Sequence, residues 1–585
     1  MNKVCRKLKQ KYKFKYDINA ILSDLIYTRI LDPCSKRSSF RTAHEFLEKP
    51  SYELHDVYRA LDVLGSECDL IQADVYKNSH FLGKRNDKIF YCDCSNYYFE
   101  IEQEDGIKKY GKSKEHRPNP IIQMGLFMDG DGISLAFSLF SGNSNEQTSL
   151  KPLEQKILED FECQKFIYCS DAGLGPESIR EYNHMGERAY IVTQSIKKLK
   201  KEEKEWALSP QGFKRVSDDK PVDISKLPED DKGLYYKDEP YTTKKLQQRL
   251  IITYSPKYAL YQKSIRSKQI ERAQAVLDSG NPKKNRRNPN NPARFIGTTA
   301  VTKEGETADI QHYLDEHKIS EESQYDGLYA VCTDLLDDEV SDILKVSEGR
   351  WQIEECFRIM KTDFSTRPVY MRDENRIKAH FLICFLALMI YRFLERKLNY
   401  KYTCEELLDT LKAMNFAEKN GVVKAYGDYE EMLQMEKPDG AYIAVTPNDH
   451  YRLSMLCLKY GVPVLCEKAM FQNSREAKEV FAVSKEKGIF VMEALWSRFL
   501  PAVREAEEWL ATGRIGKAKL AHCTIGFRAD QDPEKRYYSP KLGGGASKDI
   551  TVYAYEITTY LIRQKLKNRT VSAIWSESGV DESSI

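Results

Sequence analysis

The chain has 585 residues, and its 90 Lys and Arg against 88 Asp and Glu leave a formal net charge of +2. This length exceeds what one hydrophobic core needs, so we expect several domains. The near-neutral balance excludes a uniformly basic protein, so any affinity for nucleic acid must come from local patches. The 14 cysteines are scattered without paired C-x-x-C spacing, which argues against structural zinc and for reduced thiols in the cytoplasm.

Residues 1–84 show helical periodicity, for example at Ile18, Ile21, Leu22 and Leu25, and form a candidate remnant of a DNA-binding region. The basic N-terminus has no hydrophobic signal region behind it. The longest apolar run, Phe381–Ile390, is too short to span a bilayer and predicts a buried helix. We therefore expect a cytoplasmic protein that makes no use of a membrane.

Strand patterns begin at residue 85. The aromatic-rich run Ile89–Glu100 contains Asp93, whose neighbours Cys92 and Cys94 should point to the opposite face of the strand. Two apolar runs around residues 129–132, Asp-Gly-Asp-Gly, predict a hairpin. A helix over 150–161 then leads to a short apolar strand that ends at Asp171.

The stretch between Asp171 and Glu354 is too long for a connection inside a compact domain, which predicts an inserted, β-rich domain over 196–325. It carries the two densest basic stretches of the chain. For Lys197–Lys204 a solvated face is as good an interpretation as DNA contact, since glutamates are interspersed. The second stretch has no acidic residue and favours DNA phosphates; its residues are Lys283, Lys284, Arg286 and Arg287.

A polar stripe on one helix completes the candidate site. On a helix turning 100° per residue, Arg350, Glu354 and Lys361 fall at about 0°, 40° and 20°, beside an apolar face. Aspartates at the ends of adjacent strands and a glutamate on a packed helix would supply oxygen ligands for two Mg²⁺ ions, with Mn²⁺ as an alternative. His380 is expected to pack, since histidine suits Mg²⁺ sites poorly.

The order Asp93, Asp171 and then R-x3-E-x6-K resembles the DDE transposases of bacterial insertion sequences, in the group with a Tyr-Arg-Glu-Lys signature. Further matching segments are Tyr97–Phe99, Tyr110–Pro118 and Ser141–Ser144. The resemblance, which covers about residues 15–415, implies a ribonuclease-H-like core in two halves, 85–195 and 326–415. It further implies three metal ligands, Asp93, Asp171 and Glu354.

The same resemblance implies DNA contacts for Arg350 and Lys361. The position of the signature tyrosine holds Ser347, which has no ring to stack on a displaced base. Trp351 lies nearby and could serve as a DNA contact or as core.

Residues 416–585 resemble the Gfo/Idh/MocA oxidoreductases, as a partial Rossmann-like domain (416–510) and a partial C-terminal domain (511–585). The matching motifs include Ala441–Asn448, Val464–Lys468 and Met492–Trp496. The resemblance implies a cofactor site, now vestigial, with Lys468, Asp549 and Tyr553 at the places that serve proton transfer. The candidate cofactor-binding residues are Thr446, Pro447, Asn448, Glu467, Lys468, Asp549 and Tyr553.

A G-x-G-x-x-G turn, which holds the pyrophosphate in a Rossmann domain, occurs nowhere in the sequence. We therefore expect a truncated module without useful NAD(P) binding. The leading interpretation is an α/β DDE transposase that cleaves and joins DNA, acting on transposon ends and target DNA as a homodimer in a synaptic complex. The alternatives are an NAD(P)-dependent oxidoreductase and an inactive fusion remnant.

Overall fold

The computed structural model describes residues 2–46, 48–228, 230–279, 291–301, 309–529, 536–563 and 570–584. The chain forms two compact units, Met1–Asn415 and Phe416–Ile585. The boundary falls within the helix α14 (Cys404–Asn420). Each unit has its own sheet and its own hydrophobic core.

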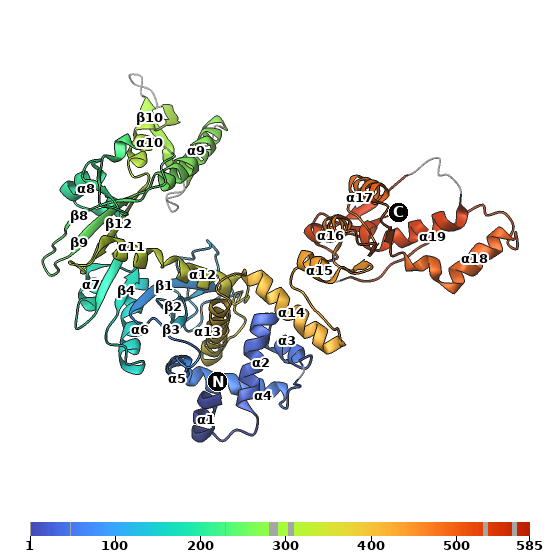
Figure 1. Ribbon diagram of the computed structural model, residues 1–585, viewed down its shortest axis with the longest axis horizontal. Coiled ribbons are helices and arrows are strands. Elements are labelled where there is room, and N and C mark those ends of the chain that lie inside the picture. The colour runs from blue at the N-terminus through green and yellow to red at the C-terminus, as the bar shows by residue number, and fades with distance from the viewer. Residues whose placement is uncertain are drawn as a thin grey trace. The chain divides into compact units, whose positions relative to one another are not determined.

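A ten-stranded sheet organises the first unit, in the order β3-β2-β1-β4-β5-β12-β9-β8-β6-β7 (Figure 1). The first three strands form an antiparallel meander, whereas β1, β4 and β5 run parallel. The hairpin predicted around residues 129–132 is the β2–β3 connection. The strands are β1 (Ile89–Tyr98), β2 (Ile121–Asp129), β3 (Ser134–Ser141), β4 (Ile167–Ser170), β5 (Ala189–Thr193), β6 (Phe213–Arg215), β7 (Pro221–Val222), β8 (Tyr235–Pro240), β9 (Arg249–Tyr254) and β12 (Leu328–Thr333).

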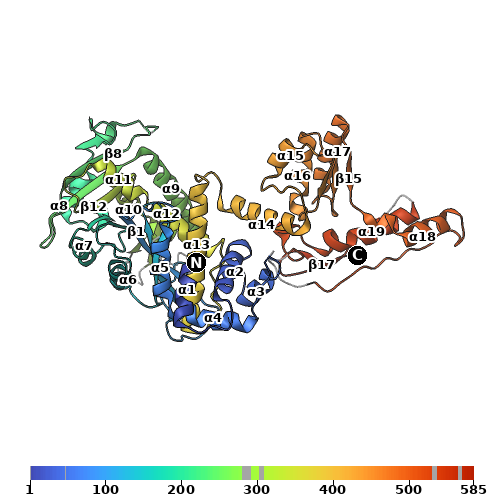
Figure 2. The same cartoon turned by 60° about the horizontal axis from the view of Figure 1, so that its bottom comes forward.

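One face of this sheet is covered by a helical layer built around α13 (Glu374–Lys397), as Figure 2 shows from a second side. Residues 377–389 of α13 are almost all buried, as the apolar run predicted. Among the described residues α13 alone is long and apolar enough to cross a membrane, and 83% of its most apolar window is buried inside the protein. Its partners are α1 (Asn2–Lys11), α2 (Ile18–Leu31), α3 (Lys36–Ala43), α4 (Leu54–Ser66), α5 (Cys68–Ser79), α11 (Val340–Glu348) and α12 (Trp351–Lys361).

The opposite face carries α6 (Glu146–Asp160) and α7 (Glu177–Asn183). Cys92 and Cys94 are buried on this face among aromatic side chains, as strand alternation predicted. Asp93 therefore lies on the other face, the one that α12 packs against. The helix α6 begins four residues earlier than expected because Asn145 caps it by accepting the amide of Gln147.

The segment predicted as a β-rich insertion, 196–325, extends the main sheet. Its strands β6 to β9 continue the main sheet, because β9 pairs along its whole length with β12. Residues 250–252 are fully buried, which suits an interior strand. Beyond this edge lie α8 (Lys201–Leu208), α9 (Pro256–Asp278), α10 (Glu316–Ser323) and the separate hairpin β10 (Ile296–Val301) and β11 (Asp309–Leu314).

The second unit contains a parallel sheet in the order β13-β14-β15, the βαβ pattern of a Rossmann-like fold. Its strands are β13 (Ala441–Ile443), β14 (Val464–Cys466) and β15 (Val491–Glu493), with α15 (Tyr429–Glu436), α16 (Pro447–Lys459) and α17 (Ser474–Lys487) between and beside them. They are followed by α18 (Pro501–Ala511), α19 (Val552–Ile562), β16 (Ala573–Trp575) and β17 (Asp581–Ser584).

Candidate functional site

Asp93 and Asp171 lie at the same level of two adjacent parallel strands. Cys92 of β1 is in register with Ser170, the last residue of β4, so the two aspartates occupy the next positions on neighbouring strands. Asp93 accepts a hydrogen bond from the amide of Cys94 at 2.7 Å, and Asp171 accepts one from the amide of Leu174 at 3.0 Å. The sheet register therefore brings these two carboxylates together.

The ionised form of Asp93 is destabilised by its surroundings. Burial, together with the negative charges of Asp171 and Glu146, raises the pKa of Asp93 to about 6 against the opposing effect of Lys114. Lys114 donates to the carbonyl of Cys94 and lies 3.6 Å from the Glu146 carboxylate. One lysine thus partly compensates three acidic groups, an arrangement that favours binding of additional positive charge.

Lys361, at the end of α12, faces this acidic group. Burial of its side chain, together with the positive charge of Lys114, lowers the pKa of Lys361 to about 8 against the opposing effect of Asp93. The ammonium lies 5.3 Å from the ring centroid of Tyr97 and 3.8 Å from Glu115, which also pairs with Arg367. The structure therefore places Lys361 within electrostatic range of Asp93.

Glu354 and Arg350 are positioned differently. The apolar face of α12 is buried as predicted, and Glu354 is exposed to solvent. Arg350 caps the helix, with its guanidinium 3.4 Å from the Tyr329 hydroxyl. Across the described parts of the chain, no group of three His, Cys, Asp or Glu side chains is close enough to hold a metal ion, so Glu354 does not join the two aspartates in this conformation. Trp351 is 60% exposed, which excludes the core role considered for it.

A second cluster of polar residues occurs in the second unit. The Lys468 ammonium lies 3.1 Å from an Asp549 carboxylate oxygen and 4.8 Å from the ring centroid of Tyr553. The Tyr553 hydroxyl accepts the indole N–H of Trp496 at 2.8 Å. Arg536 also pairs with Asp549, at 2.7 Å. The three residues predicted for proton transfer are therefore assembled within hydrogen-bonding or ring-contact distance.

The other residues predicted for this cofactor site lie around the carboxyl ends of β13 and β14. Thr446 is the N-cap of α16, Pro447 is its first residue, and Asn448 contacts Asp449. Glu467 accepts a hydrogen bond from Tyr442. Cofactors of doubly wound sheets bind at the carboxyl ends of the strands, so this is the edge at which a nicotinamide would be expected.

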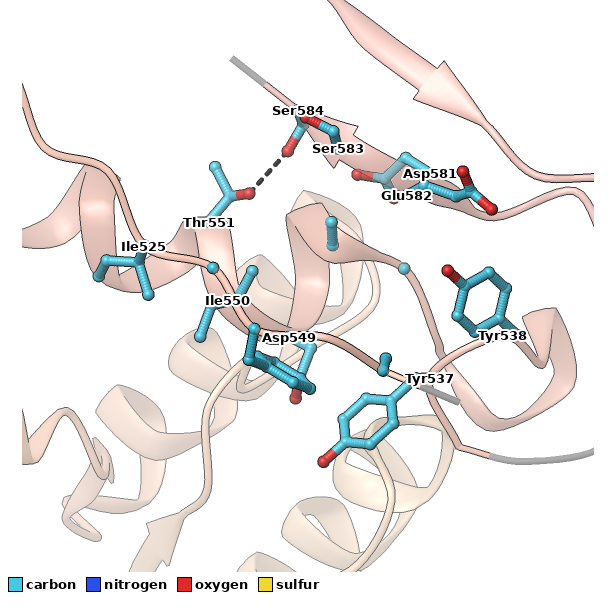
Figure 3. A pocket seen from close by; sticks show the side chains of 15 residues that line it. Ile525, Tyr537, Tyr538, Asp549, Ile550, Thr551, Asp581, Glu582, Ser583 and Ser584 are labelled. Atoms are coloured by element: carbon cyan, nitrogen blue, oxygen red, sulfur yellow. Dashed lines mark hydrogen bonds between the residues drawn. The ribbon is translucent and has the colours of Figure 1, made fainter. Parts of the chain in front are cut away.

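A pocket of about 210 Å³ adjoins Asp549 (Figure 3). Asp581 on its wall accepts the amide of Ser547 at 2.7 Å, and Thr551 and Ser584 share a hydrogen bond of 2.7 Å. The lining is mostly polar and includes two tyrosines, Tyr537 and Tyr538.

Comparison with known proteins now identifies both parts. The family model described as "Transposase DDE domain" matches residues 98–390, half of the chain. The chain belongs to this transposase family. Two further models match the remainder: "Oxidoreductase family, NAD-binding Rossmann fold" over 398–495, and "GFO/IDH/MocA C-terminal domain" over 503–584. Both resemblances predicted from the motifs are thereby confirmed.

The curated relatives match the oxidoreductase part. The mouse trans-1,2-dihydrobenzene-1,2-diol dehydrogenase is 35% identical over 176 residues, which is 30% of this chain and 52% of that protein. The human protein of the same name is 35% identical over 175 residues, again 30% and 52%. The chain thus spans about half the length of these relatives. Among solved structures, aldose-aldose oxidoreductase from Caulobacter crescentus is 21% identical, covering 29% of this chain and 54% of that one, with a TM-score of 0.26.

Several polar residues of the transposase site escaped prediction. Lys114 and Glu115 belong to the segment Tyr110–Pro118, which carried the family resemblance but gave no sign of their roles. Glu146 opens α6, and Arg367 lies in the loop after α12. Only the sheet and helix packing brings these four residues near Asp93 and Lys361.

Two further predictions concern His380 and the second basic stretch. His380 is buried and contacts the carbonyl of Thr366 at 3.0 Å; burial and the neighbouring Lys36 and Arg29 hold its pKa well below the usual value, in agreement with a packing role. The basic residues Lys283, Lys284, Arg286 and Arg287 lie outside the residues that the structure describes. Arg294, at the end of that stretch, pairs with Glu322 at 3.2 Å.

Proposed function

We propose that this chain is a DDE transposase that cleaves and joins DNA by phosphoryl transfer. The observation that carries the proposal is the pair Asp93 and Asp171, adjacent on parallel strands within the matched transposase domain. The strand order β3-β2-β1-β4-β5, an antiparallel meander followed by parallel strands, supports a ribonuclease-H-like core made of residues 85–195 and 326–415. The β-rich insertion of 196–325 then extends the sheet of that core.

The residues present fit divalent metal ions. Asp93 and Asp171 offer hard oxygen donors, and burial, together with the charges of Asp171 and Glu146, raises the pKa of Asp93, so a bound cation would stabilise its ionised form. Glu354 is the third ligand by its place in the motif. Bound Mg²⁺ or Mn²⁺ ions would make water or a 3′-hydroxyl more nucleophilic and stabilise the leaving oxygen.

The cations of α12 supply the rest of the site. Arg350 and Lys361 stand at the two ends of α12, with Lys361 nearer Asp93, and both can bind phosphate oxygens of the DNA strand. Lys114 keeps Asp93 ionised at neutral pH by opposing the burial and the neighbouring acids. The proposal includes DNA ends and target DNA as substrates, a homodimer in the synaptic complex, and a cytoplasmic location.

Nicking of a supercoiled plasmid that carries the gene with its flanking DNA tests this function. We expect cleavage by the full chain with Mg²⁺, none with EDTA, and none with Asp171→Asn. Since amide replaces carboxylate with little change in size, the variant should still bind DNA. Cleavage by Asp171→Asn at the normal rate would remove this residue from the metal site.

The assembled cluster of Lys468, Asp549 and Tyr553 supports a second candidate, hydride transfer with NAD(P) in the second unit. The missing glycine-rich turn opposes it, because that turn holds the pyrophosphate. A fluorescence titration of the full chain with NADH tests whether the second unit binds this cofactor. Saturation at micromolar NADH would establish a cofactor site, whereas a linear response would leave the cluster without its cofactor.

A further inference from the structure

One face of the helix α9 (Pro256–Asp278) is hydrogen-bonded to neighbouring segments of the first unit. Gln262 accepts a hydrogen bond from the amide of Gly327 at 2.8 Å, and Arg266 pairs with Asp326 at 2.5 Å. Further along, Gln269 accepts from Arg294 at 2.6 Å. Figure 1 shows α9 beside α10 and β10 at the far end of the sheet. The polar groups on this inner face are therefore satisfied within the protein.

The outer face has a different character. With 100° and 1.5 Å per residue, Lys257, Tyr261, Lys268 and Arg272 fall within an arc of about 60° and span about 22 Å along the axis. All four side chains are exposed. Glu271 lies about 60° to one side of Lys268. The row is thus a straight line of positive charge along one exposed edge of the helix.

The three cations of this row have no ion pair or hydrogen bond within the described residues. This contrasts with Arg266 on the inner face, which has its aspartate. The rings of Tyr258 and Tyr261 stack on each other at the start of the row, with centroids 6.3 Å apart and planes 23° apart, and Tyr261 is 61% exposed. Unpaired cations in a row with exposed aromatic rings are typical of surfaces that follow a nucleic-acid backbone.

We propose that this row of α9, Lys257, Lys268 and Arg272 with Tyr258 and Tyr261, binds the phosphate backbone of the DNA on which the transposase acts. The inference rests on the proposed function for the identity of its ligand. The lysines and the arginine neutralise phosphates, and the tyrosine pair stacks against unpaired bases. Their regular spacing along a rigid helix suits a polyanion that runs parallel to it.

The test compares two full-chain variants that lose the same charge. Lys257→Ala/Lys268→Ala/Arg272→Ala removes the row. Lys84→Ala/Lys88→Ala/Lys165→Ala removes three other exposed lysines, at the ends of β1 and β4 that are remote from Asp93 and Asp171. Binding to a fluorescent duplex of arbitrary sequence is measured by anisotropy from 50 to 300 mM salt, with EDTA present so that cleavage plays no part.

Each phosphate contact contributes about 0.9 to the slope of log K against log salt, so the row variant should lose about 2.7 from this slope. The control variant should keep the wild-type slope. Tyr258→Leu/Tyr261→Leu should keep the slope but bind single-stranded DNA several-fold more weakly. The circular dichroism spectrum and the urea midpoint of each variant should match the wild type, which controls for loss of the fold.

An unchanged slope in the row variant would overturn the inference, as would equal losses in the two charge variants. The inference would also be overturned if the row variant lost binding to anionic lipid vesicles while its slope of log K against log salt for DNA stayed constant. The proposed function fails separately. If the wild-type protein shows no metal-dependent nicking but the row variant shows the predicted fall in slope, the DNA surface is supported and the catalytic assignment is rejected.

Discussion

Replacing Asp93 by asparagine should make the protein more stable while abolishing strand cleavage. The pKa of this carboxyl is raised from 3.8 to about 6 in the fold, first by burial and then by Asp171 and Glu146. A raised carboxyl pKa means that the folded protein binds the proton more tightly than the unfolded chain does. The ionised group therefore destabilises the fold above pH 6, and this cost disappears as the pH falls below 3.8.

The shift of about two pKa units corresponds to roughly 3 kcal/mol, an upper bound because Asp93 keeps some contact with solvent. Urea denaturation at pH 7.5 in EDTA should show Asp93→Asn to be about 1–3 kcal/mol more stable than the wild type, with the difference shrinking towards pH 4. The same variant should bind DNA normally and fail to nick plasmid with Mg²⁺. A loss of stability at pH 7.5, or nicking at the wild-type rate, would refute the reasoning.

Three further substitutions test the packing of the first unit away from the site. Burial lowers the pKa of Lys36 to about 7, so between pH 7 and 10 the unfolded chain binds a proton that the folded protein does not. The wild-type free energy of unfolding should therefore rise with pH over this range, by at most about 1.4 kcal/mol per pH unit, and Lys36→Met should flatten that rise. Arg85→Met leaves the buried Asp129 carboxylate, now 2.6 Å from the guanidinium, without its partner and should cost about 3–5 kcal/mol in urea denaturation. Gly65→Ala would gain about 1 kcal/mol of helix propensity, yet its Cβ would lie 1.9 Å from the Asn375 carbonyl oxygen, so Tm should fall rather than rise.

The sequence was sufficient for features that local patterns determine. An aromatic-rich run revealed β1, two apolar runs around Asp-Gly revealed the hairpin of β2 and β3, and a continuous apolar run revealed α13. The position of Asp171 directly after a strand followed from the same patterns. Asp93 was expected at a strand end but lies in the middle of β1, because β1 continues to Tyr98 in its pairing with β2. The adjacency of the two aspartates needed the pairing of β1 with β4, which the motif order suggested and the register of Cys92 with Ser170 supplies.

Distances and contacts between segments far apart in the chain could not be predicted, because they depend on long-range packing. The periodicity of residues 350–361 placed Glu354 and Lys361 on one stripe, but the distance of each to β1 depends on how α12 rests on the sheet. The ion pair of Lys114 with Glu146 joins segments that no local pattern connects. The insertion was predicted from the length between Asp171 and Glu354. That its strands extend the main sheet could not be predicted, because β9 pairs with β12, far along the chain, and such pairing leaves no mark on either strand alone.

Equilibrium binding of Mn²⁺, followed by the electron paramagnetic resonance of the free ion, tests the central claim most directly. The wild-type chain should bind Mn²⁺ at neutral pH, and Asp93→Asn and Asp171→Asn should each weaken this binding at least tenfold, because each removes a charged oxygen ligand. Glu354→Gln should weaken it as well, most clearly when DNA is present. Unaltered Mn²⁺ binding in both aspartate variants would contradict the assignment of this site as a metal-dependent transposase centre.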